Sequence, residues 1–228
     1  MQKVLLALSG TAIVFMSVKP ASAVTLDIVT GGKEVAGQGL VSKVSGTTTF
    51  DFENGISTSG FVKFSSPTGS PAVVQGSKSG EYGAPFNDTS HYLTISSTRD
   101  NAVGNTGSVS VKFAQPLDYF GLYWGSIDDY NSIAFYKGDT LLNQYSGRDV
   151  PKTTASGNQT SLADNQYVNF FADTKGAFDT VVLSSTAPAF ESDNFAYRQA
   201  PEPGSVLGLL TVGAVGAGFV LKRKCCFY

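Results

Sequence analysis

Two pairs of carboxylates are the side chains in this sequence whose spacing is best suited to chemistry. Asp51 and Glu53 are separated by one residue, and so are Glu191 and Asp193. Residues two apart on a β-strand point to the same side of the sheet, so each pair would present its acids together. If the first and last strands pair, the four acids and Asn194 gather at one sheet edge. Oxygen ligands of this kind suit Ca²⁺, which makes a structural calcium site one interpretation of the pattern.

Two other interpretations of the same acids remain open. Acidic side chains on an exposed edge strand discourage pairing between molecules, and this role needs no ligand. Glu191 and Asp193 could instead be the two carboxyl groups of a glycoside hydrolase. No accompanying substrate-binding signature supports the hydrolase, which makes it the weaker alternative.

The remaining catalytic inventory is small, and it favours a protein that is not an enzyme. His91 is the only His, and no Ser lies in a Gly-x-Ser-x-Gly turn. Cys225 and Cys226, the only two Cys, lie at the very end of the chain. The central region therefore offers neither a disulfide nor the usual ligand set of a zinc site.

Aromatic side chains form the other candidate site, at Tyr123, Trp124 and Tyr130. Aromatic rings can stack on the C–H faces of sugars, so these three residues are candidates for glycan stacking. The alternative is structural, because the consecutive bulky residues at 119–124 are also expected in a strand that is buried on both faces.

Short β-strands must position all of these residues, because period-2 patterns dominate the middle of the chain. A Gly-Asp turn at 138–139 predicts a hairpin, and the Gly/Ser/Pro-rich stretch 65–87 is predicted to be a long loop with one short strand. The expected strands are 26–30, 47–52, 61–64, 92–96, 108–113, 119–124, 132–136, 140–145, 167–171, 177–184 and 194–197.

The number and spacing of these strands predict an all-β fold. The expected architecture is an antiparallel, jelly-roll-like β-sandwich over residues 24–200, with a β-barrel as the alternative. No repeat of fixed period is present, which disfavours a solenoid. The length of this region fits one domain of ordinary size.

The N-terminus has the three-part pattern of a signal peptide over residues 1–23. Lys3 supplies a basic start, residues 4–18 are mostly apolar and uncharged, and Ala21 and Ala23 form an Ala-x-Ala cleavage site. Signal peptidase is therefore expected to cut before Val24.

The C-terminus, residues 201–228, has a second three-part pattern. Pro201-Glu202-Pro203 precedes an uncharged stretch at 205–221, and the basic cluster Lys222-Arg223-Lys224 follows at once. The stretch is near the lower length limit for a membrane-spanning helix. The basic cluster would stay in the cytoplasm, which would leave residues 24–200 outside the inner membrane, transiently anchored.

This tail resembles the PEP-CTERM sorting signal of proteins that Gram-negative bacteria export. The resemblance implies processing by exosortase near Pro201-Glu202-Pro203. The chain departs from the usual pattern by continuing past the basic cluster with Cys225-Cys226-Phe227-Tyr228. Stretches at 50–55, 118–126 and 190–197 also look like one set of exosortase-dependent surface proteins, a group that implies no enzymatic activity.

The charge balance excludes one class of partner. The chain has 16 basic and 18 acidic residues, and five of the basic ones lie in the two end segments, so residues 24–203 carry 11 against 18, a net charge of −7. An acidic region without a basic patch argues against nucleic acid binding.

The expected function is a structural or interaction protein of the cell surface or extracellular polysaccharide matrix. The alternatives are a carbohydrate-binding module and, third, a glycan hydrolase.

Overall fold

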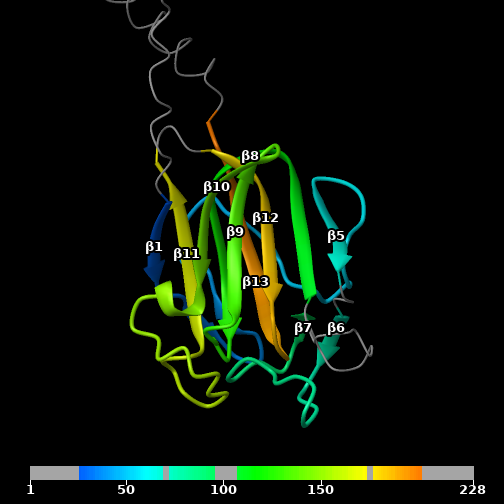
Figure 1. The fold of residues 1–228 in the computed structure, drawn as a ribbon, viewed down its shortest axis with the longest axis vertical. Helices are drawn as coiled ribbons and strands as arrows, with labels where there is room; N and C mark the ends of the chain where they lie inside the picture. Colours follow the sequence, from blue (N-terminus) through cyan, green and yellow to red (C-terminus); the bar gives the residue numbers. More distant parts are fainter. Residues whose placement is uncertain (1–25, 69–71, 96–106, 174–176, 202–228) are drawn as a thin grey trace, which may run out of the picture.

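One long strand, β8 (Gly107–Gly125), organises the fold because it belongs to two layers (Figure 1). The computed structural model describes residues 26–68, 72–95, 107–173 and 177–201. The other elements are β1 (Leu26–Thr30), β2 (Lys33–Val35), β3 (Gly39–Val41), β4 (Thr48–Phe50), β5 (Val62–Thr68), β6 (Ala72–Gln75), β7 (His91–Ile95), β9 (Asn131–Lys137), β10 (Thr140–Ser146), the 3-10 turn η2 (Gly147–Asp149), β11 (Gln166–Ala172), β12 (Phe178–Ser185) and β13 (Phe190–Gln199).

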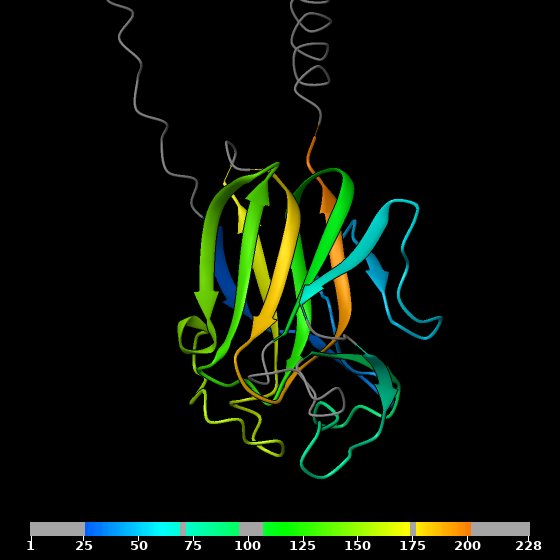
Figure 2. The ribbon, with the colours of Figure 1, turned by 45° about the vertical axis from the view of Figure 1, so that its right-hand side comes forward.

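The two halves of β8 pair with different neighbours. Its first half lies between β12 and β5, and β9 and β10 continue that layer beyond β12. Its second half lies between β11 and β13, with β1 beyond β11 and both β4 and β7 alongside β13. Three strands of the first layer, β9, β10 and β12, stand in front of β1 and β11 in Figure 2. All these pairs are antiparallel, which confirms the predicted β-sandwich.

The sequence predicted two strands where the structure has one. The sequence pattern predicts separate strands at 108–113 and 119–124, whereas β8 continues between them through Ala114, Gln115 and Pro116, which are all exposed. Pro116 has no N–H to donate, so it is tolerated where β8 changes its neighbours. The register with β12 also shifts there, between the pairs Thr180–Lys112 and Phe178–Leu117.

The aromatic run of β8 is buried on both faces. Phe120 and Trp124 belong to the large core between the layers. Tyr119 and Tyr123 face the other way and pack with Tyr167 beneath the segment that contains β2 and β3. Of the two interpretations of this run, the central, doubly buried strand is confirmed.

The structure confirms the predicted hairpin but shortens one of the predicted strands. The hairpin at residues 137–140 is confirmed, with Lys137 paired to Thr140 and Gly138 at a φ of 56°. The predicted strand 47–52 ends early, because β4 stops at Phe50 and Phe52 has a φ of 59°, in the left-handed region. Asp51 and Glu53 therefore lie in a turn and not on a strand.

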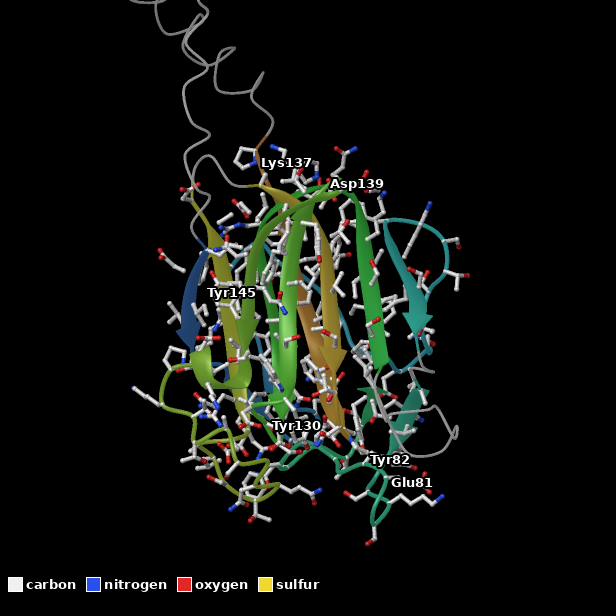
Figure 3. All side chains as sticks on the ribbon, in the orientation of Figure 1. Glu81, Tyr82, Tyr130, Lys137, Asp139 and Tyr145 are labelled. Carbon is white, nitrogen blue, oxygen red and sulfur yellow. The ribbon has the colours of Figure 1, made fainter. Side chains whose placement is uncertain are left out.

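The sandwich has two distinct ends. The tip of the β9–β10 hairpin, with Lys137 and Asp139, lies at the top of Figure 3, where β13 also ends (Figure 1). We call this the tail end. The loops 76–90, 126–130 and 147–165 meet at the opposite end, where Glu81, Tyr82 and Tyr130 lie (Figure 3), and we call this the loop end.

Both predicted targeting segments lie almost entirely outside the residues that the structure describes. The predicted signal peptide at 1–23, with Ala21 and Ala23, is not among the described residues, and neither is the tail after Pro201. Within the described ranges, no helix is long and apolar enough to cross a bilayer. The predicted membrane helix at 205–221 lies beyond those ranges.

Candidate functional site

A cleft of about 600 Å³ opens at the loop end. It is formed by the loop after β6, by one side chain from the loop before β11, and by the start of β13. Its lining residues are Ser77, Lys78, Ser79, Gly80, Glu81, Tyr82, Gln159, Pro188, Ala189 and Glu191. The lining thus combines one aromatic ring with several hydroxyl, amide and charged groups.

Glu191 forms the buried wall of this cleft, with 3% of its surface exposed. One carboxylate oxygen accepts a hydrogen bond from the Gly83 N–H at 2.9 Å, and the other accepts one from the Ser126 hydroxyl at 3.2 Å. Burial raises the pKa of Glu191 to about 7, although both hydrogen bonds act in the opposite direction. Glu191 thereby links three segments of the loop end.

The outer wall of the cleft is a tight loop stabilised by its own contacts. The backbone N–H groups of Glu81 and Tyr82 both donate to the Lys78 carbonyl, and the Lys78 N–H donates back to the Tyr82 carbonyl at 2.9 Å. The Lys78 ammonium forms an ion pair with Glu81. The Tyr82 ring packs edge-on against Tyr92 of β7, with 6.5 Å between ring centroids. These contacts hold Tyr82 and Glu81 beside Glu191.

Asp164 organises the loop that brings Gln159 to the cleft. Its carboxylate accepts hydrogen bonds from the hydroxyl groups of Thr153, Thr154 and Ser156 at 2.7–2.9 Å. Burial disfavours the charged form, but these hydrogen bonds outweigh it and lower the pKa of Asp164 well below its usual range. The neighbouring Asn165 accepts from the backbone N–H groups of Phe86 and Ser126, which ties this loop to the two others.

A second acidic group lies beside the cleft, where Asp193 approaches Asp88 and Ser90. The Ser90 hydroxyl lies 2.5 Å from one Asp88 oxygen and 3.2 Å from one Asp193 oxygen. Burial raises the pKa of Asp193, and the charge of Asp88 raises it further. Burial also raises the pKa of Asp88. Two acids therefore meet here in a place where neither ionises easily.

The structure brings only part of the predicted calcium site together. The first and last predicted strands do pair, with Phe50 opposite Phe195. However, Asp51 is exposed, Glu53 binds His91 through both its carboxylate oxygens, and the Asn194 amide donates to the Gln38 and Leu40 carbonyls.

Glu191 and Asp193, the other two members of the predicted site, both face the loop 76–90, as their spacing predicted. They contact different groups there. In the described part of the chain, no three His, Cys, Asp or Glu side chains are placed to hold a metal ion. The structure therefore does not bring the five predicted residues together, because Glu53 follows the turn at Phe52 and binds His91.

The predicted glycan-stacking residues are also not a surface platform. Trp124 is fully buried and stacks on Phe190, with ring centroids 4.6 Å apart. Tyr123 is buried, and its hydroxyl donates to the Phe86 carbonyl. Tyr130 is half-buried and donates to the carbonyl of Pro188, a cleft residue. The aromatic ring that does line the cleft, Tyr82, lies in a stretch that the sequence identified only as a loop.

The stretches that resemble exosortase-dependent surface proteins are neighbours in the fold. Trp124 of β8 pairs with Ser192 of β13 and stacks on Phe190. Phe52 packs edge-on against Phe195, with ring centroids 4.9 Å apart. Segments far apart in the sequence thus meet around β13, the strand that carries Glu191 and Asp193.

Comparison with known proteins identifies the tail. Residues 199–224 match the family model of the PEP-CTERM protein-sorting motif. The chain carries a PEP-CTERM sorting motif. This motif is that of an exported protein targeted to exosortase and sent to the cell envelope or surface. No curated protein matches the sequence.

The matched residues define where the PEP-CTERM motif joins the sandwich. The match begins at Gln199, the last residue of β13, and includes the predicted Pro201-Glu202-Pro203 and Lys222-Arg223-Lys224. Cys225 and Cys226 lie just beyond it. The sorting motif therefore starts directly at the tail end, with no intervening linker.

Proposed function

We propose that this protein is a structural or interaction component of the cell surface or extracellular polysaccharide matrix, and that its loop end makes the contacts. One observation carries this proposal: the sorting motif begins at the tail end, whereas the cleft lies at the loop end. Both features are on β13, which starts with Phe190 and Glu191 and ends at Gln199.

The length of β13 gives the separation between these two features. A strand rises about 3.3 Å per residue, so ten residues place the cleft roughly 30 Å from the start of the motif. While the tail is held in the inner membrane, the loop end therefore points away from the bilayer. Signal peptidase and exosortase would be the partners during export, and the inner membrane would be a transient anchor.

The second candidate function is carbohydrate binding at the cleft, and the composition of the lining favours it. Tyr82 offers a ring for a sugar face. Glu81 offers a carboxylate acceptor and Gln159 offers an amide for the hydroxyl groups of a sugar. Tyr82 would take the stacking role that the sequence predicted for Trp124 and Tyr123, because those two rings are buried.

The burial and the hydrogen bonds of Glu191 favour glycan binding over glycan hydrolysis. Both of its oxygens accept hydrogen bonds from protein groups, and almost none of its surface is open to a substrate. A catalytic acid must reach the bond that it cleaves. We therefore propose a protein that is not an enzyme.

Cell fractionation tests the main proposal, with the full chain followed by antibody in wild-type cells and in cells that lack exosortase. The mature protein is expected at the cell surface or in the medium of wild-type cells, and in the membrane fraction without exosortase. Retention in the cytoplasm would contradict the proposal.

A glycan array tests the second candidate. Tyr82→Ala is expected to lose any glycan that the wild type binds. Lys137→Ala, an exposed change at the tail end, should retain it. Absence of binding by the wild type to any matrix glycan, or equal binding by both variants, would remove the cleft as a carbohydrate site.

A further inference from the structure

Asp88, Ser90 and Asp193 form a cluster in which the carboxylate oxygens that can accept a hydrogen bond outnumber the donors that Ser90 provides. One Asp88 oxygen accepts both the Ser90 N–H at 2.8 Å and the Ser90 hydroxyl at 2.5 Å. The single hydroxyl hydrogen is therefore used, yet the same hydroxyl lies 3.2 Å from an oxygen of Asp193.

The stronger anomaly is at the two carboxylate oxygens that do not contact Ser90. Asp88 Oδ2 and Asp193 Oδ1 are buried and have no hydrogen-bond donor among the described residues. Asp88 is 5% exposed and Asp193 is fully buried. A buried carboxylate oxygen without a partner costs free energy, and either a proton shared by the two acids or a cation bound between them removes that cost.

We propose that Asp88 and Asp193 bind a divalent cation, best matched by Ca²⁺, with the Ser90 hydroxyl as a third oxygen ligand. Two carboxylates balance the charge of the ion. All three ligands are hard oxygen atoms, which Ca²⁺ prefers, and water can complete its flexible coordination shell. The nearest imidazole, His91, has its Nδ1 3.0 Å from Glu53, so it is engaged outside this group.

This site differs from the calcium site that the sequence predicted. It keeps Asp193 and replaces the other four residues by Asp88 and Ser90 from the loop 76–90. With only two carboxylates, the affinity is expected to be low, in the range of about 10⁻⁴ to 10⁻³ M that is typical of extracellular modules. Calcium reaches such concentrations outside cells.

The position of the cation gives it a structural role. Asp88 also bridges to Gly37 and Gln38 in the segment that covers the second layer. Asp193 lies on β13, two residues after Glu191. A cation here would join that segment, the cleft loop and β13, and this inference holds whether or not the cleft binds a glycan.

Thermal melting of the full chain in mild detergent, in EDTA or in about 10 mM CaCl₂, tests the proposal. A site with the expected affinity raises the melting temperature by roughly 3–8 °C. Tb³⁺, a Ca²⁺ substitute, should also give emission sensitised by Tyr123, which is the cross-strand partner of Asp193, and Ca²⁺ should displace it.

Two variants locate the site. Asp193→Asn and Asp88→Asn should each lose the calcium shift and most of the Tb³⁺ emission. In EDTA they should melt no lower than the wild type, because each removes one of two confined charges. Asp139→Asn, an exposed acid at the tail end, is the matched control and should respond as the wild type does.

Two outcomes would overturn the proposal. If neither Ca²⁺ nor Mg²⁺ changes the melting of the wild type, the two carboxyl groups share a proton instead. If both variants keep the full calcium shift, the ion binds elsewhere. Because Asp88→Asn and Asp193→Asn are independent changes, failure of one to fold leaves the other to decide.

Discussion

Glu191 is a buried acid that works as a fixed acceptor for two loops. Its oxygens bind the Gly83 N–H and the Ser126 hydroxyl, so the cleft wall is held by one side chain of β13. The Glu191 side chain is expected to keep its conformation when a ligand enters the cleft, because its hydrogen-bonding partners are already in place. The cleft is therefore expected to be preformed.

Removal of this acceptor should destabilise the whole loop end. Glu191→Ala leaves the buried Gly83 N–H without a partner and opens a cavity, and it should cost about 2–4 kcal/mol of unfolding free energy. Glu191→Gln keeps an acceptor for Gly83 and should cost less than half as much. Urea denaturation of the full chain in detergent measures both, with Asp139→Ala as the exposed control. Equal stability of the Ala variant and the wild type would contradict this role.

Trp124 provides a second prediction at the level of one residue. It is fully buried and stacked on Phe190, so Trp124→Ala should cost about 3–5 kcal/mol. Its fluorescence should be blue-shifted and protected from quenching by iodide in the wild type. A red-shifted, easily quenched signal from the folded protein would show instead that the ring is exposed.

At the scale of elements, strand existence was predictable and strand partners were not. Alternation of Val109, Val111 and Phe113 predicted a strand with one buried face, and the structure has that face in the core. The same local pattern could not show that β8 continues through Pro116 into the other layer. That continuity depends on β11 and β13, which lie about 50–80 residues further along the chain.

The carboxylate of Asp164 accepts several of the hydrogen bonds that hold its loop together. Because folding lowers the pKa of Asp164, its stabilising effect is present above the unfolded pKa of about 3.9 and is lost as pH falls below it. Asp164→Asn should cost about 2–4 kcal/mol at neutral pH. The difference from the wild type should shrink between about pH 4 and pH 2.

Chemical denaturation across that pH range checks this prediction. Asp129→Asn is the matched control, because Asp129 is exposed and forms an ion pair with the exposed Arg148 at the same end of the molecule. Exposed ion pairs of this kind contribute little. A wild-type advantage over Asp164→Asn that stays constant down to pH 2 would refute the assignment.

At the scale of the whole molecule, the C-terminal sorting motif could be predicted from the sequence and the cleft could not. Pro201-Glu202-Pro203 and Lys222-Arg223-Lys224 are local patterns, so order and spacing reveal them. The bond from Gly83 to Glu191 spans 108 residues and involves a backbone N–H, which has no sequence signature. The contact between Ser90 and Asp193 spans 103 residues, so Asp88 could not be paired with Asp193 in advance.

The opposite placement of motif and cleft leads to a prediction about accessibility. Residues 24–200 contain no Cys, so single Cys residues can report on each end once Cys225 and Cys226 are changed to Ser. Ser79→Cys lies at the loop end and Asp139→Cys at the tail end, and both positions are exposed. In spheroplasts of a host without exosortase, a bulky polymer-linked maleimide should label position 79 several-fold faster than position 139.

Release from the membrane should abolish that difference. When the tail after Ala200 is deleted, no anchor restricts access to the tail end, and the two Cys variants should react at similar rates. A small maleimide should label both equally in either state, which controls for local reactivity. If position 139 reacts as fast as position 79 while the tail is intact, the loop end does not point away from the bilayer. That result would contradict the proposal that the loop end is the contact surface.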